Sequence, residues 1–72
     1  MKILAQIDTS RGENGNHINE VWSLFDVFGS KLCIQIISKR IYDNDYRFVY
    51  QYTLPEMELD HPEILQQLLD LL

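Results

Sequence analysis

Residues 31–54, KLCIQIISKRIY-DND-YRFVYQYTL, contain two apolar runs that are separated by three polar residues. Both runs are rich in β-branched and aromatic side chains, which favour strands. The separator, Asp43-Asn44-Asp45, consists of residue types that favour turns. This stretch therefore predicts a β-hairpin, and we expect the other elements to cover one of its faces.

The length of the loop decides which side chains share a face of this hairpin. A three-residue loop pairs Tyr42 with Tyr46 and therefore Ile36 with Tyr52. A slip of one residue moves every side chain to the opposite face, so a loop of even length would invert the assignment. With the three-residue loop, the face expected to form the core carries Leu32, Ile34, Ile36, Phe48, Tyr50, Tyr52 and Leu54. The face expected to meet solvent carries Cys33, Gln35, Ile37, Lys39, Ile41, Arg47, Val49, Gln51 and Thr53.

The first sixteen residues predict a strand and then a loop. Residues 2–9, KILAQIDT, alternate with period two, which is typical of a half-buried strand. Ile3, Ala5 and Ile7 form its apolar side, and Leu4 is an exception on the polar side. Residues 10–16, SRGENGN, carry two glycines and two asparagines and are expected to form turns.

Residues 17–28, HINEVWSLFDVF, have a polar stripe with helical spacing, made by Asn19, Ser23 and Asp26. This stripe predicts a helix, with Asn16 as its N-cap and Gly29 at its C-terminal end. A strand is the alternative. It fits less well because it places the carboxylates of Glu20 and Asp26 among apolar side chains.

The last part of the chain predicts a second helix over residues 61–72, HPEILQQLLDLL. Asp60 and Glu63 have the spacing of a capping box, Pro62 suits a first helical turn, and the acidic residues 55–61 are expected to be irregular. The resulting order is β-α-β-β-α in a single domain of residues 1–72. We expect an α+β two-layer sandwich, with a three-stranded mixed sheet and both helices on one face.

The charge of the chain excludes several classes of partner. Eleven acidic residues face six basic ones, and the formal net charge is −5. Nucleic acids and anionic membranes need clustered Lys and Arg, so neither is an expected partner. The only cysteine, Cys33, cannot form an intrachain disulfide, and a free thiol suits a reducing compartment. With no apolar run of membrane-spanning length, we expect a cytoplasmic protein.

A chain of 72 residues buries a small core, and a second copy is one way to stabilise it. The last helix is richer in leucine than a single apolar stripe requires. Some of its aliphatic side chains, Leu71 and Leu72 among them, should therefore be exposed or buried against a partner. These features predict a homodimer.

No residues of the chain have the spacing of a catalytic or metal site. His17, Cys33 and His61 lie on three separate segments without paired metal-ligand spacing. Cys33 in the middle of a strand has no feature that would lower its pKa. We therefore expect no metal, no cofactor, no catalytic residue and no enzymatic activity.

The remaining hypothesis is a non-enzymatic protein-binding module: a regulator, an inhibitor or an accessory subunit. It would bind a protein partner of unknown identity through the open sheet face, an exposed strand edge, or the leucine-rich last helix. The aromatic and basic tip of the hairpin has a composition that binding surfaces favour. The alternative is a sensor of a small ligand or metal that uses the aromatic end of the sheet. The expected partner-binding residues are Ile37, Lys39, Ile41, Tyr42, Tyr46, Arg47, Val49, Leu71 and Leu72.

Overall fold

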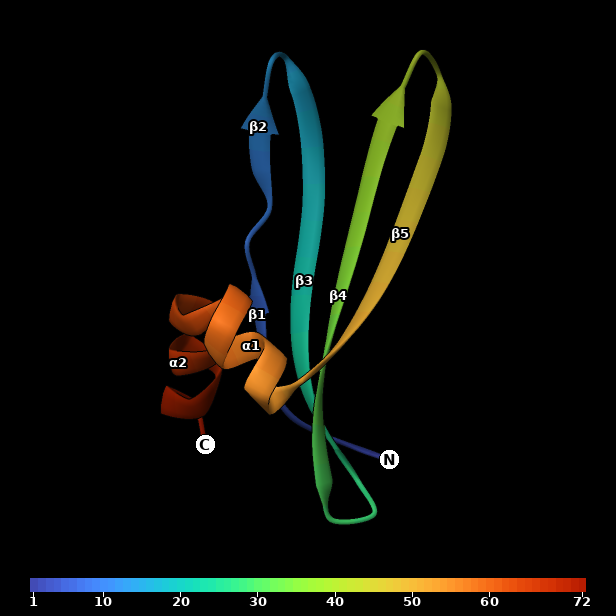
Figure 1. Ribbon diagram of the computed structural model, residues 1–72. Coiled ribbons are helices and arrows are strands. Elements are labelled where there is room, and N and C mark those ends of the chain that lie inside the picture. Colours follow the sequence, from blue (N-terminus) through green and yellow to red (C-terminus); the bar gives the residue numbers. More distant parts are fainter.

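The computed structural model describes all 72 residues as five strands followed by two helices (Figure 1). The chain is an α+β protein, but the predicted order β-α-β-β-α is wrong. The strands are β1 (Lys2–Asp8), β2 (Arg11–Glu13), β3 (Asn16–Val27), β4 (Ser30–Ile41) and β5 (Asn44–Thr53). The helices are α1 (Leu54–Asp60) and α2 (Pro62–Asp70).

All strand pairs are antiparallel, so the predicted three-stranded mixed sheet is also wrong. The sheet has the order β1-β3-β4-β5, and β2 pairs with the other end of β3. β1 and β2 thus lie end to end along one edge. Thr9 and Ser10 separate the two strands, and the Thr9 N–H donates to the Glu20 carbonyl over 2.9 Å.

The predicted helix over residues 17–28 is instead most of β3, the strand at the centre of the sheet. Its even-numbered residues point to one face and its odd-numbered residues to the other. Trp22 and Leu24 are buried on the first of these faces, together with Glu20. The buried carboxylate that argued against a strand is accommodated because neighbouring side chains satisfy it.

Three turns of two residues connect β2 to β3, β3 to β4 and β4 to β5. In each turn both central residues have positive φ, as type I′ hairpin turns require. The predicted three-residue loop is therefore wrong: Ile41 pairs with Asn44, and the loop is Tyr42-Asp43. The six φ values are Asn14 51°, Gly15 78°, Phe28 52°, Gly29 86°, Tyr42 50° and Asp43 64°.

The even loop places the β4 side chains on the faces opposite to those predicted, whereas Phe48, Tyr50 and Tyr52 of β5 lie on the predicted core side. Cys33 pairs with Tyr52 and Ile37 with Phe48, and these residues lie on the face that the helices cover in part. Ile34 and Ile36 lie on the opposite face, although they were predicted to belong to the core. We call these two faces the helix side and the open face.

A bulge in β1 corrects the prediction for Leu4. The pairing with β3 shifts between Ile3 and Ala5, so one extra residue is inserted at Leu4. Leu4 packs against the core instead of facing solvent. Ile3 is 55% exposed, while Ala5 remains buried on the helix side.

The capping box lies one helix earlier than predicted. Thr53 caps α1, because its hydroxyl accepts from the Glu56 N–H while the Glu56 carboxylate accepts from the Thr53 N–H. Residues 55–60 are therefore helical. α2 follows with His61 as its N-cap, without a side-chain cap from Asp60. Neither helix has the length and apolar character that crossing a membrane requires.

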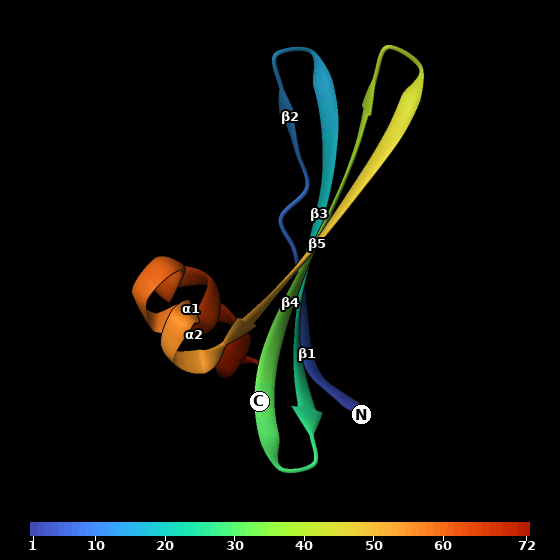
Figure 2. The same ribbon diagram turned by 45° about the vertical axis from the view of Figure 1, so that its right-hand side comes forward.

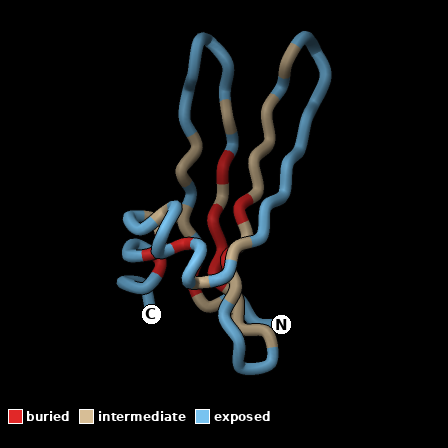
Figure 3. Tube along the Cα trace, in the orientation of Figure 1, coloured by how far each residue is buried: buried red, intermediate tan, exposed pale blue.

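The core is small and lies at one end of the molecule. The helices bury Met57, Leu65 and Leu68 against the lower half of the helix side (Figure 3). Figure 2 shows that both helices lie on the same side of the sheet and that the β2–β3 and β4–β5 hairpins diverge at the far end. The sheet residues in this core are Ala5, Trp22, Leu24 and Cys33.

The β3–β4 turn provides a test of the fold. Phe28 has a positive φ and its side chain is fully exposed, so it bears the cost of a left-handed conformation without a packing gain. Phe28→Asn should raise the free energy of unfolding by about 1 kcal/mol, because asparagine tolerates this conformation. Urea denaturation followed by the fluorescence of Trp22 measures the change. Phe28→Ala is the control and should give no comparable gain, whereas an equal gain in both variants would contradict the turn assignment.

Candidate functional site

The open face of the sheet carries a continuous set of apolar side chains with no layer packed over it. Ile36 is central: on one side it pairs with Val21 and on the other with Val49, which is 58% exposed. In antiparallel sheets with one solvated face, that face is usually polar. The apolar residues of the open face are Ile3, Val21, Phe25, Val27, Leu32, Ile34, Ile36 and Val49.

A second uncovered surface is the upper half of the helix side, beyond the helices. We call it the upper surface and define it by Ile18, Ile37, Lys39, Ile41, Tyr46 and Phe48. Lys39 extends over the Phe48 ring, with its Nζ atom 5.4 Å from the ring centroid. This cation–π contact holds a charged group among apolar ones.

The predicted partner-binding residues are divided between these surfaces. Arg47 and Val49 lie on the open face, as expected, and Tyr42 lies in the turn. Ile37, Lys39 and Ile41 belong to the upper surface, because the two-residue loop places the β4 side chains on the other face. Tyr46 also belongs to the upper surface and shares a face with Phe48, as predicted. Leu71 and Leu72 follow α2 and are 58% and 63% exposed. The structure therefore does not bring these nine residues together at one site.

The two hairpins separate beyond the last β3–β4 pair, Ile18 with Lys39. A surface depression lies in this region, where the β3 and β4 ends diverge. Its lining is mostly polar, and three of the six Lys and Arg residues of the chain contribute to it. The lining residues are His17, Asn19, Ser38, Lys39, Arg40, Asp45, Tyr46 and Arg47.

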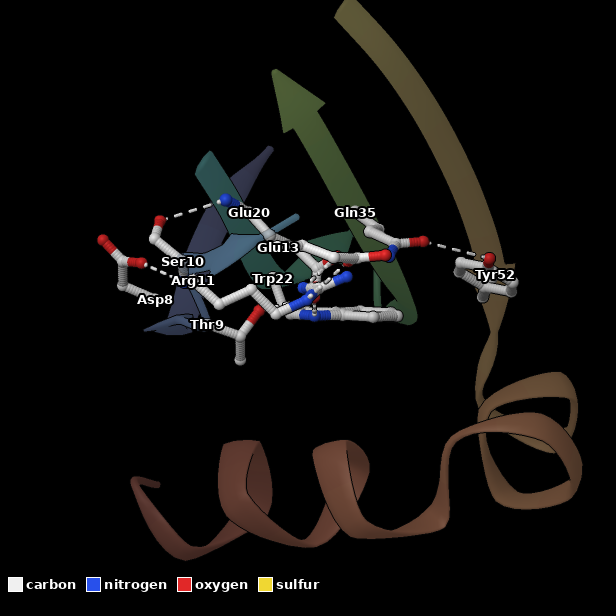
Figure 4. A network of polar contacts seen from close by, with 9 residues as sticks. All are labelled: Asp8, Thr9, Ser10, Arg11, Glu13, Glu20, Trp22, Gln35 and Tyr52. Carbon is white, nitrogen blue, oxygen red and sulfur yellow. Dashed lines mark hydrogen bonds and ion pairs between the residues drawn. The ribbon is translucent and has the colours of Figure 1, made fainter. Parts of the chain in front are cut away.

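The buried Glu20 carboxylate organises a polar cluster at the boundary between the core and the upper surface (Figure 4). Its Oε1 atom accepts from the Thr9 hydroxyl and from Trp22 Nε1, the latter over 3.0 Å. Its Oε2 atom accepts from Gln35 Nε2 over 3.2 Å and from Arg11 over 3.3 Å. The cluster thus joins the loop after β1 to β2, β3 and β4.

The cluster continues to β5 through Gln35, whose Oε1 atom accepts from the Tyr52 hydroxyl over 3.2 Å. Tyr52 and Trp22 are also stacked, with centroids 5.9 Å apart, and the His61 ring contacts both. His61 lies between α1 and α2. The aromatic contacts of His61 therefore connect the junction of α1 and α2 to Trp22 and Tyr52, which both belong to the Glu20 cluster.

Hydrogen bonds control the pKa of Glu20. Burial by itself raises the pKa, but the bonds from Thr9, Trp22 and Arg11, together with the Arg11 charge, lower it overall. No buried side-chain nitrogen or oxygen lacks a partner. None of the three surface depressions is lined by Glu20, so its geometry is that of a structural carboxylate.

The three candidate metal ligands are dispersed in the structure. His17 is exposed and hydrogen-bonded to Asn19, while His61 packs against aromatic rings. Cys33 is fully buried, and burial raises the pKa of its thiol. No group of three or more His, Cys, Asp or Glu side chains is placed to hold a metal ion.

Two aromatic residues occupy strained and exposed turn positions that sequence reasoning did not connect. Phe28 and Tyr42 both begin type I′ turns with positive φ and are 101% and 94% exposed. Neither residue gains packing in exchange for its backbone strain. Such strain is found at functional sites. The signal in the sequence was an aromatic residue directly before Gly29 and Asp43.

The Glu20 cluster predicts a specific pH dependence of stability. A carboxylate with a lowered pKa stabilises the fold at pH values above its ordinary pKa of 4.5, and this contribution is lost as the pH falls through the lowered value. Glu20→Gln should reduce the free energy of unfolding at pH 7 by about 2–4 kcal/mol, because it removes charge-assisted hydrogen bonds. Urea denaturation between pH 7 and pH 3 measures both effects.

Tyr52→Phe is the matched control for this measurement. It removes one hydrogen bond to Gln35 and leaves the carboxylate in place, so it should cost about 1 kcal/mol and keep the acid dependence. Asp8 and Glu56 also have lowered pKa values and contribute to the acid loss in every variant. An equally steep loss below pH 4.5 in Glu20→Gln and in the wild type would contradict the assigned role of Glu20.

Neither models of protein families, nor curated proteins, nor solved structures gave a match to this chain. The function therefore has to be argued from the surfaces and side chains described above.

Proposed function

We propose that the protein is a non-enzymatic binding module that docks another protein on its open face. Its biological role would be that of a regulator, an inhibitor or an accessory subunit. The observation that carries the proposal is the continuous apolar set centred on Ile36, which no element of the chain covers. Uncovered apolar patches of this kind typically mark protein-binding surfaces.

The distribution of apolar residues supports a functional reason for this surface. The chain buries seven hydrophobic residues in its core and places eight apolar residues on the open face. Strand formation does not require apolar residues on a solvated face, because the polar residue threonine also favours strands. The apolar open face therefore contributes to binding rather than to the packing of this chain.

The charge of the chain indicates the kind of partner. The two helices carry five acidic and no basic side chains. A partner with an apolar surface flanked by basic residues would be attracted to the molecule and would bury the open face. We therefore propose a basic protein as the partner, docked by its own apolar surface.

The basic depression where the hairpins diverge supports one alternative, a sensor of a small anionic ligand. Arg40, Arg47 and His17 lie around it, and Arg40 is engaged only in an exposed ion pair of 3.8 Å with Asp43. Arginine and lysine side chains of this kind bind phosphate or carboxylate groups. A thermal-shift titration with inorganic phosphate tests this alternative, because binding to the native state raises the unfolding midpoint. Arg47→Gln should abolish the rise, and the absence of any rise in the wild type would contradict the alternative.

The binding proposal predicts that one lysine on the open face blocks capture of the partner. Ile36→Lys places a charge between Val21 and Val49, where its desolvation would oppose docking. The fold should persist, because Ile36 is only partly buried and the lysine stem can lie along the sheet. Affinity capture from the native cell, followed by mass spectrometry, should recover a specific protein with the wild type and at least tenfold less of it with Ile36→Lys.

Two matched variants identify the surface that acts. Gln67→Lys adds the same charge on an exposed position of α2 and should leave capture unchanged. Ile37→Lys lies beside Ile36 in sequence but on the upper surface, so it should also leave capture unchanged. Loss of capture with Ile37→Lys and retention with Ile36→Lys would contradict docking on the open face.

A further inference from the structure

The two edges of the sheet differ in how much free backbone they offer. On one edge the bulge at Leu4 and the break at Thr9 and Ser10 interrupt β1 and β2. On the other edge, β5 pairs with β4 without a register shift over ten residues, and it contains no proline or glycine. β5 is the last strand in the order β1-β3-β4-β5, so no strand pairs with its outer edge, and in Figure 1 both helices lie to the left of β5. A long and regular edge of this kind is a template for another strand.

The two-residue turn decides which backbone groups of β5 face outward. Ile41 and Asn44 close the turn as a hydrogen-bonded pair, and hydrogen-bonded and non-hydrogen-bonded pairs then alternate along the hairpin. The even-numbered residues of β5 therefore direct their backbone N–H and C=O groups toward β4. The odd-numbered residues direct theirs to the free edge. The Thr53 N–H agrees with this assignment, because it is free of β4 and donates to Glu56 over 3.0 Å.

The hydrogen bond from the Thr53 N–H to Glu56 also shortens the free edge of β5. Since Glu56 occupies the N–H of Thr53, the free edge consists of four residues: Asp45, Arg47, Val49 and Gln51. These four positions are symmetric about Phe48. A second copy of β5, antiparallel and related by a twofold axis at Phe48, would satisfy all of them, with Arg47 opposite Val49 and Asp45 opposite Gln51. A register centred on Val49 instead needs the occupied Thr53.

We infer that the protein forms a homodimer by antiparallel pairing of its β5 strands, centred on Phe48. On the helix side this register places Phe48 opposite its symmetry mate and Tyr46 opposite Tyr50. These side chains are 38%, 43% and 45% exposed in the single chain. Opposed aromatic residues are favourable cross-strand pairs, so the register adds side-chain contacts to the backbone bonds.

The charges of the chain are compatible with this arrangement. The turn of one copy would lie level with the start of α1 in the other, because Asn44 is opposite Tyr52. Among the basic residues near the turn, Lys39 lies on the helix side and would therefore share a face with the acidic α1 of the other copy. The Lys39 ammonium would be attracted by the carboxylates of that helix. The open faces of both copies would form one continuous surface.

Val49→Pro tests the edge itself. It removes an outward N–H without removing a bond to β4, and proline is tolerated on edge strands. Sedimentation equilibrium should show the wild type and the control Val49→Thr at twice the mass of one chain, and Val49→Pro at 8.5 kDa with an unchanged circular dichroism spectrum. A wild type that stays at 8.5 kDa over the whole dilution series would overturn the inference, as would a folded Val49→Pro that remains dimeric.

Disulfide cross-linking tests the register of the β5 pair. It also tests the dimer by itself if Val49→Pro does not fold. A non-hydrogen-bonded antiparallel pair has a Cα–Cα distance of about 4.5 Å, which a disulfide can span. Under mild oxidation Phe48→Cys should therefore become a covalent dimer, and Val49→Cys should not, because its partner is Arg47. The reverse result would overturn the register. Neither measurement depends on capture of a partner, so the dimer and the proposed function are tested separately.

Discussion

The two-residue turns are the constraint on which the rest of the structure depends. Each connects antiparallel strands through two residues with positive φ, and each therefore determines which side chains share a face. Two such turns in succession place Trp22, Gln35 and Tyr50 on the helix side. Had the β4–β5 loop contained three residues, Phe48 and Tyr52 would have lain on the open face. The position of the core and both uncovered surfaces follow from this parity.

Glu20 shows how the fold accommodates a carboxylate that the hydrophobic pattern of residues 17–28 disfavours in a strand. The carboxylate lies on the helix side of β3, at the upper limit of the core. It is stable there because Thr9, Trp22, Gln35 and Arg11 donate to it. These donors come from four separate parts of the chain. The cluster holds the break between β1 and β2 against β3, and through Gln35 it also reaches Tyr52. Its polar character ends the core at this level of the sheet.

The helices are too short to cover the sheet, and this accounts for the uncovered surfaces. β3 and β4 have twelve residues each, whereas α1 and α2 have seven and nine. Because a helix rises about 1.5 Å per residue and a strand about 3.3 Å, the helices can span only part of the sheet. The acidic helices occupy one end of the helix side, and three of the six basic residues, Lys39, Arg40 and Arg47, lie near the other end of the sheet. The free backbone edge of β5, which the helices leave uncovered, is the basis for the proposed antiparallel association of two copies.

The sequence by itself determined the elements whose signals are local. The β1 alternation, the pair of strands around residues 31–54 and the helix that begins at Pro62 were all predicted from neighbouring residues. The Asn14-Gly15 dipeptide was a local signal for a second hairpin that the helical polar stripe of residues 17–28 obscured. Only the tertiary structure decided that this segment is a strand, because three of the four donors that satisfy Glu20, those of Thr9, Arg11 and Gln35, come from other strands and loops. It also decided the faces, since Tyr42-Asp43 and Asp43-Asn44-Asp45 are both acceptable turns locally. Only the pairing of β4 with both β3 and β5 selects the two-residue loop, because the helices must bury Trp22, Cys33 and Tyr52 on one side.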